Sequence, residues 1–108
     1  MHIPLKEAQL ELSSSGQLFK LLYEHGSLAV EIYKPEKTDH QKPHDRDEIY
    51  IIISGTGRFI HGDQEVSFEP HDFLFVPAGR KHRFIDFTDD FSTWVIFFGP
   101  VGGEAGQS

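Results

Sequence analysis

Residues 43–55 read PHDRDEIYIIISG: a histidine and a glutamate lead into a run of isoleucines that ends at a glycine. In a strand, side chains two or four residues apart point to the same face, so His44 and Glu48 can face one interior. A second stretch, residues 77–82, reads PAGRKH and brings His82 after a tight Pro-x-Gly turn. The two stretches together predict a metal held inside a small β-barrel.

These three side chains form a donor set that suits a transition metal. Two imidazoles and one carboxylate bind divalent Fe, Mn, Ni, Co or Zn and leave positions open for water or substrate. Each residue taken alone fits a hydrogen-bonded polar cluster at a barrel mouth, without metal, better than it fits a metal ligand. The joint spacing favours the metal, so we predict one divalent transition metal whose identity the residues do not fix.

Length and composition exclude several classes of protein. The 108 residues fit one domain, and the lack of cysteine excludes disulfides, thiolate metal sites and cysteine nucleophiles. The formal charge of −7 argues against non-specific binding to nucleic acid, which depends on basic patches. No apolar stretch approaches the roughly 18–20 residues of a membrane span, and residues 1–7 lack the pattern of a signal peptide. We therefore expect a cytoplasmic protein with no nucleic-acid and no membrane partner.

The pattern along the chain predicts an all-β body. Ten phenylalanines against one methionine and one tryptophan give an aromatic-rich composition typical of strands. Glycine, proline and aspartate separate short apolar segments, which indicates a barrel or sandwich. We expect a short helix or arm over residues 1–16, the barrel over 17–98 and a flexible tail over 99–108. The predicted strands are residues 17–24, 28–33, 48–54, 58–61, 65–68, 73–76, 82–87 and 93–98.

The two stretches also carry the spacing of a known pair of motifs. The pattern H-x3-E-x6-G at residues 44–55 matches the second half of G-x5-H-x-H-x3/4-E-x6-G, and P-x-G-x2-H at residues 77–82 matches the core of G-x5-P-x-G-x2-H-x3-N. These motifs belong to the cupins, and residues 28–98 resemble a small single-domain bacterial cupin of the cupin 2, conserved barrel type. The resemblance implies a cupin-type double-stranded β-helix, or jelly-roll barrel.

Three positions depart from these motifs. Lys42 stands in place of the first histidine of H-x-H, His71 in place of the opening glycine of the second motif, and Asp86 in place of its closing asparagine. The Lys42 change matters most, because that position usually supplies a metal ligand in the family.

The run DHQKPH at residues 39–44 resembles a sub-group of small bacterial cupins with an Asp-x-Gln-x-Pro-His variant of the first motif. In such a variant Gln41 or His40 supplies the fourth ligand, beside the two histidines and the glutamate of the motifs. A bulge near Pro43 would turn either side chain inward. We favour Gln41.

Tyr50 and Asp86 are the candidates for a catalytic role. Tyr50 shares the predicted face of Glu48 and would donate its hydroxyl to a bound substrate, although packing in the barrel wall is the simpler interpretation. Asp86 shares a predicted face with His82, and a buried carboxylate beside a metal would act as a general base. A hydrogen bond from Asp86 to a neighbouring loop is the simpler interpretation there.

Three functions follow from the resemblance. The first is a metal-dependent enzyme of dioxygenase, isomerase or decarboxylase type that acts on a small organic molecule. The second is a non-catalytic cupin that binds or senses a small ligand. The third is a barrel whose metal site has degenerated, for which Lys42 is the best support. The expected partners are a small-molecule ligand and a second copy of the chain, because the strand edges and aromatic surface of a small barrel favour a homodimer.

Overall fold

The computed structural model describes residues 1–104, which form one helix and eight strands in two sheets. The order is β1-β2-β8-β3-β6 in the larger sheet and β5-β4-β7 in the smaller one, and every strand pair is antiparallel. This architecture confirms the predicted all-β fold with a short N-terminal helix. The elements are α1 (Leu5–Ser15), β1 (Phe19–His25), β2 (Leu28–Tyr33), β3 (Asp47–Ser54), β4 (Gly57–His61), β5 (Gln64–Phe68), β6 (Phe73–Val76), β7 (His82–Ile85) and β8 (Ser92–Phe98).

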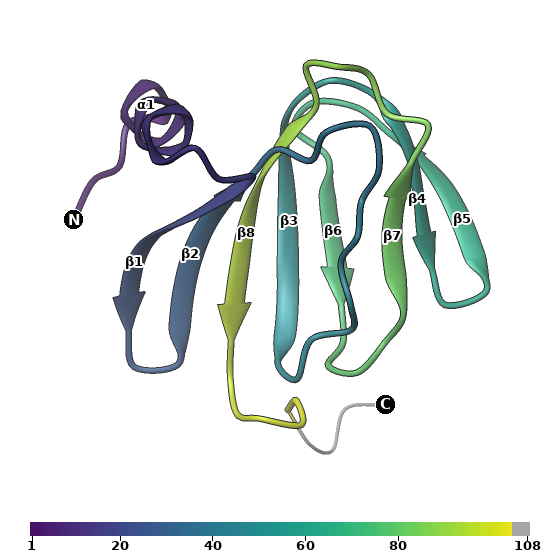
Figure 1. The fold of residues 1–108 in the computed structure, drawn as a ribbon. Helices are drawn as coiled ribbons and strands as arrows, with labels where there is room; N and C mark the ends of the chain where they lie inside the picture. Colours follow the sequence, from purple (N-terminus) through teal and green to yellow (C-terminus); the bar gives the residue numbers. More distant parts are fainter. Residues whose placement is uncertain (105–108) are drawn as a thin grey trace.

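The core lies between the inner faces of the two sheets (Figure 1). Strand side chains alternate between the two faces, so Tyr50 and Ile52 of β3 point inward towards Phe59 of β4 and Phe84 of β7. The Tyr50 ring meets the Phe84 ring edge-on, with centroids 4.9 Å apart, and the Phe59 and Phe84 centroids are 4.7 Å apart. The phenylalanines that marked the sequence as strand-rich therefore join the two sheets.

The strand register sets which inner residues are neighbours in the larger sheet. Glu48 on β3 lies opposite Phe97 on β8. In the next inner row, Tyr50 lies opposite Val95, and Val95 lies opposite Glu31 on β2. Two carboxylates and a tyrosine hydroxyl therefore face the barrel interior from two adjacent rows.

The helix α1 covers one part of the outer face of the larger sheet. Ala8 and Leu12 are four residues apart, so both lie on one side of the helix, where they pack with Ile32 of β2. Gly16 ends the helix with a φ of 70°, a left-handed conformation that glycine adopts without strain. Within residues 1–104, no helix has the length and apolar character needed to cross a membrane.

The loop of residues 34–46 runs from the larger sheet across to β7 and back into β3 (Figure 1). Its buried Asp39 accepts hydrogen bonds from the Tyr33 hydroxyl at 2.7 Å and from the backbone amide of Phe84 on β7 at 2.9 Å. The backbone amide of Gly79 donates to the carbonyl oxygen of His44 at 2.7 Å. These bonds attach the loop to both sheets and hold His44 at the barrel mouth.

Residues 99–104 turn back along the start of β3. The backbone amide of Gly102 donates to the carbonyl oxygen of Asp45 at 2.6 Å, and that of Glu104 donates to Oδ2 of Asp47 at 3.1 Å. The segment predicted as a flexible tail begins at residue 99, and three of its first six residues, Gly99, Gly102 and Glu104, donate backbone hydrogen bonds to the preceding domain. Residues 105–108, which carry the rest of that prediction, lie outside the described residues.

Candidate metal centre

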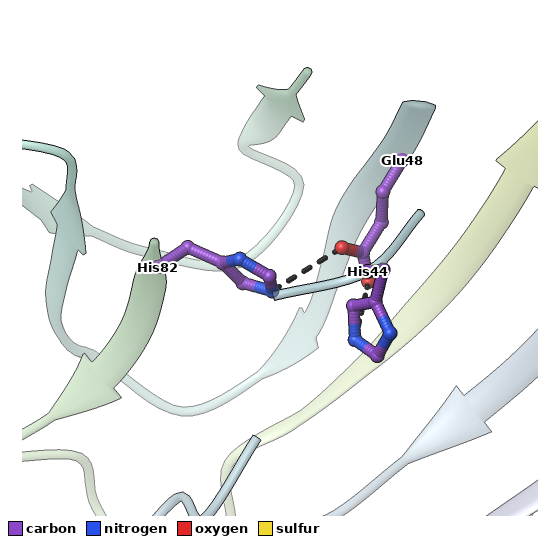
Figure 2. Close-up of side chains that lie close together, drawn as sticks. All are labelled: His44, Glu48 and His82. Atoms are coloured by element: carbon purple, nitrogen blue, oxygen red, sulfur yellow. Dashed lines mark ion pairs between the residues drawn. The ribbon is translucent and has the colours of Figure 1, made fainter. Parts of the chain in front are cut away.

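Three separate elements bring His44, Glu48 and His82 together. Glu48 points inward from the start of β3, His82 from the first residue of β7, and His44 from the loop that leads into β3 (Figure 2). One ligand atom of each residue lies within 4.8 Å of those of the other two. Glu48 and His82 are buried and His44 is half-buried, so the group faces the interior on one side and the barrel mouth on the other.

A backbone contact fixes the chemical state of His82. Its Nδ1 lies 2.9 Å from the carbonyl oxygen of Arg80, and because a carbonyl only accepts, Nδ1 carries a proton. A neutral ring then presents the lone pair of Nε2 to Oε1 of Glu48, 3.2 Å away. Burial lowers the pKa of His82, but the Glu48 carboxylate and the Arg80 carbonyl outweigh burial and raise that pKa above 6.5. The space between these two atoms therefore favours a cation, which is either a second proton or a metal.

The carboxylate of Glu48 is buried without compensation. Glu48 is 1 % exposed, and within residues 1–104 neither of its carboxylate oxygens nor Nε2 of His82 has a hydrogen-bond partner. Its Oε2 lies 3.9 Å from Nε2 of His44. An uncompensated buried carboxylate costs several kcal/mol, and coordination to a cation offsets that cost. The donor set and its unsatisfied atoms therefore fit a divalent metal.

Gln41 lies at the edge of this group with its amide oriented. Its Nε2 donates to Oδ2 of Asp39 at 3.1 Å, so its Oε1 points the other way, towards the site. That oxygen accepts from the Tyr50 hydroxyl at 3.1 Å and lies 3.1 Å from Nε2 of His44. The structure thus brings the Gln41 oxygen next to one of the three clustered residues.

The remaining sequence candidates lie in different places. Tyr50 is fully buried, and burial, followed by repulsion from Glu48, raises the pKa of its hydroxyl well above 10.0. Asp86 is exposed at the end of β7 opposite to His82, so the structure does not bring it to the site. His40 and Lys42 are exposed.

A pocket of about 320 Å³ opens beside His44 and Gln41. It leads from the barrel mouth along the inner face of β2 and β8, and its wall is made of Phe19, Glu31, Tyr33, Gln41, His44, Val95 and Phe97. A larger hollow of about 560 Å³ lies next to α1 on the other side of the sheet and contains none of the clustered residues. We take the smaller pocket as the candidate ligand pocket, because of these two hollows it alone is lined by one of the clustered residues, His44.

Sequence reasoning missed two residues of this region, Asp39 and Glu31. Asp39 is the first residue of the DHQKPH run, and its position in that run is the signal that would have identified it. Glu31 stands among apolar residues in the alternating segment 28–33, on the same face as Ala29 and Tyr33. The sequence shows a single carboxylate on the predicted inner face of this strand. Its role can be inferred only when the residues on the other side of the pocket are known.

Comparisons with known proteins agree with this architecture. The family model described as "Cupin domain" matches residues 29–97. A protein of Streptomyces coelicolor, named uncharacterized protein SCO3923, is 28% identical over 98 residues, which cover 89% of this chain and 93% of that protein.

Two solved structures share the fold along most of their length. A cupin-2 domain containing protein from Shewanella frigidimarina has a TM-score of 0.68 and 18% identity, covering 90% of this chain and 94% of the other. Protein NMB1881 from Neisseria meningitidis has a TM-score of 0.71 and 16% identity, covering 92% and 100% of the two chains. The cupin family model spans most of the barrel and includes both motif regions. The chain therefore belongs to the cupin family.

Proposed function

We propose that this chain is a metal-binding cupin whose metal serves a small organic molecule bound in the adjacent pocket. His44, Glu48 and His82 hold one divalent transition metal, and Gln41 supplies the fourth ligand. The observation that carries the proposal is the set of three buried ligand atoms, two on Glu48 and one on His82, that have no hydrogen-bond partner within residues 1–104. A bound cation would offset the charge of the Glu48 carboxylate and accept the lone pair of His82 Nε2.

The residues around the group have definite roles in this proposal. Arg80 fixes the tautomer of His82 through its carbonyl oxygen, and Asp39 orients the Gln41 amide. The Tyr50 hydroxyl donates to the Gln41 oxygen, and its raised pKa keeps it protonated at neutral pH. Tyr50 therefore positions the Gln41 oxygen and does not act as a general base.

When bound, the metal supplies a Lewis acid and an open position for an oxygen atom of the substrate. The reaction classes that we propose are those of a dioxygenase, an isomerase or a decarboxylase. The pocket beside His44 gives a small molecule access to that position, and its apolar wall of Val95 and Phe97 excludes water from one side.

Metal content after reloading tests the proposal. Untagged wild-type protein is stripped with a chelator, dialysed against Fe²⁺, Mn²⁺, Ni²⁺, Co²⁺ or Zn²⁺ in turn, and measured by inductively coupled plasma mass spectrometry. We expect about one equivalent of at least one metal in wild type and almost none in His82→Ala. His71→Ala removes an exposed histidine and serves as the matched control, which retains the metal. Equal metal content in wild type and His82→Ala contradicts the proposal.

Two alternatives predict different results in the same material. A non-catalytic cupin that binds its small ligand without a metal gains thermal stability from that ligand even after chelation. A ligand that binds only the folded state raises the stability of that state. In a degenerated site a side-chain cation takes the place of the metal, and the Lys42 ammonium is the candidate for it. The exposure of Lys42 favours the intact site, since its ammonium is not buried between the histidines.

We also propose that the chain forms a homodimer through the outer face of the larger sheet. The cross-strand row Val30, Ile96, Ile49 and Phe75 is apolar from β2 to β6, and Phe73 and Phe98 extend it. Phe73 is 61% exposed and Phe75 is 44% exposed, whereas α1 covers only the neighbouring residues around Ile32. An apolar sheet face of this kind is typical of an interface between copies. The absence of nucleic-acid and membrane partners and the cytoplasmic location stay predictions.

A further inference from the structure

The ligand pocket has a carboxylate, Glu31, on the wall that β2 contributes. Glu31 points inward from β2 and is half-buried, and it lies two strands away from Tyr50 in the same inner row. With strands about 4.8 Å apart, the backbones of these two residues are about 10 Å from each other. The pocket therefore has one polar end at Gln41 and His44 and a second polar point at Glu31.

The surroundings of Glu31 are unfavourable for its negative charge. Burial raises the pKa of this carboxyl, and the nearby carboxylates of Glu48 and Glu24 raise it further, while the Arg46 guanidinium lowers it. Among the hydrogen bonds and ion pairs of residues 1–104 none involves the Glu31 side chain, and the Arg46 guanidinium compensates its charge only in part. A carboxylate that faces a pocket without a partner is available to a ligand.

Aromatic rings line the pocket next to this carboxylate. Phe19, Tyr33 and Phe97 contribute their side chains to the wall. The Arg46 guanidinium already lies over the Phe97 ring, 5.6 Å from its centroid, so Phe19 and Tyr33 are the rings left to a ligand. Aromatic faces attract cations, and a carboxylate beside them adds a charge-assisted hydrogen bond. An ammonium group satisfies both, whereas a second carboxylate or a phosphate on the ligand would meet repulsion from Glu31.

We propose that Glu31 is the specificity-determining residue of this pocket: it accepts a hydrogen bond from the ammonium group of a small ligand whose oxygen atoms bind the metal held by His44, Glu48 and His82. This inference rests on the proposed metal site. A volume of about 320 Å³ admits a molecule with a single ring or a short chain between the two ends.

Three catechols that differ only at the tail test this inference. Dopamine carries an ammonium, 4-ethylcatechol carries no polar group, and 3-(3,4-dihydroxyphenyl)propionate carries a carboxylate, while all three offer the same pair of oxygens to a metal. Each is titrated calorimetrically under nitrogen into the metal-loaded wild-type protein. We expect dopamine to bind about tenfold or more tightly than 4-ethylcatechol, as one charge-assisted hydrogen bond implies, and the carboxylate probe to bind most weakly.

Two variants test whether Glu31 causes the difference in affinity among the three catechols. Glu31→Gln is expected to bind all three catechols with similar affinity. Glu24→Gln removes an exposed carboxylate that lies close enough to act on Glu31 but does not line the pocket, so we expect it to keep the wild-type order.

The outcomes separate the two proposals. Equal affinities for the three catechols in wild type, or an unchanged order in Glu31→Gln, overturn the role of Glu31 while the metal site stands. Tighter binding of hydroxytyrosol, the hydroxyl analogue, than of dopamine overturns the assignment of an ammonium. Failure of the wild-type protein to load any metal overturns the proposed function and this inference together.

Discussion

The tautomer of His82 decides what the site can hold. Because Nδ1 donates to the Arg80 carbonyl, Nε2 is left to face a buried carboxylate oxygen 3.2 Å away. Two lone pairs at that distance repel unless a cation lies between them. A single backbone contact, made by the turn before β7, thus prepares both residues for a metal.

Gln41 and His40 are adjacent in sequence, and the geometry separates them as fourth ligands. The Gln41 oxygen lies 3.1 Å from Nε2 of His44, whereas His40 is exposed. We predict that Gln41→Ala weakens metal binding by about 10- to 100-fold, the usual cost of losing a ligand or its support, and that His40→Ala leaves it unchanged. Competition with a fluorescent chelator measures both affinities. A large loss in His40→Ala with none in Gln41→Ala would reverse the assignment.

The carboxyl of Glu31 gives a pH-dependent stability. Its pKa is raised in the folded chain, so the folded state holds this proton more tightly than the unfolded state does. This contribution to stability is present below 4.5, the ordinary value, and is lost as the pH rises through the raised pKa. We predict that Glu31→Gln, made in metal-free protein, has a higher Tm than wild type at pH 7.5 and little difference at pH 4. Thermal melts across this range check it, and a difference that does not change with pH contradicts it.

At this scale the sequence predicted the residues that share a strand face and missed those that a loop brings in. Glu48 and Tyr50 follow from even spacing along β3, whereas His44 precedes the strand, which begins at Asp47, and reaches the site from the loop. Asp39 and Glu31 act on the same site, but Asp39 reaches it through the fold of a loop and Glu31 through a strand register that no local pattern encodes. Asp86 shows the opposite error, since even spacing from His82 predicted a shared face. Its φ of 51° ends the strand at Ile85 and leaves Asp86 exposed.

Among the elements, the loop of residues 34–46 connects the fold to the site. Asp39 accepts four hydrogen bonds, from Tyr33, from the backbone of Phe84 and from both the backbone and the side chain of Gln41. The loop is therefore attached to β2 and β7 at the same point where it orients a predicted ligand. Strand boundaries could be predicted because apolar segments alternate with glycine and proline, but the path of this loop depends on a buried carboxylate.

Asp39→Asn tests the importance of that attachment. The asparagine amide has one oxygen and no negative charge, so it cannot accept all four hydrogen bonds that the Asp39 carboxylate accepts. We therefore predict a loss of about 1–3 kcal/mol in the free energy of unfolding. Metal affinity should fall as well, because the Gln41 amide is no longer held. Urea denaturation and metal titration check the two effects. Asp63→Asn, at an exposed hairpin turn, is the control and should change stability by less than about 0.5 kcal/mol. An Asp39→Asn protein as stable as this control would contradict the role given to the loop.

The backbone conformation explains why the first motif ends in a glycine. Gly55 has a φ of 86°, and a Cβ there would lie 2.5 Å from the Cα of Phe91. Only glycine permits the backbone of the turn after β3 to approach Phe91 so closely. This turn directs the chain from the larger sheet into the smaller one, which explains the spacing between Glu48 and Gly55 without a catalytic role.

For the whole molecule, the two faces of the larger sheet have separate tasks. The inner face carries the pocket and the clustered ligands, while the outer face presents the apolar row from Val30 to Phe75. The larger sheet contains β2, β3 and β8, so an interface on its outer side would support the strands that carry Glu31 and Glu48.

Phe75→Lys tests the homodimer. A lysine at the β6 end of the apolar row would bury a charge at the interface, so we predict conversion of a dimer into a monomer of unchanged fold. Val66→Lys is a matched control, because Val66 is also 44% exposed but lies on the smaller sheet. Light scattering gives the mass of each variant, and circular dichroism confirms the fold. A monomeric wild-type protein at working concentrations contradicts the proposal.

The metal itself is the central claim, and anomalous diffraction from a metal-soaked crystal tests it most directly. Data collected at the absorption edge of the metal that the protein retains locate the ion without prior assumption. We predict one strong peak per chain, about 2.0–2.2 Å from a nitrogen of His44, a nitrogen of His82 and an oxygen of Glu48, with the Gln41 oxygen at a similar distance. No anomalous peak among these three side chains, with Nε2 of His82 hydrogen-bonded to the Glu48 carboxylate in its place, would contradict the account.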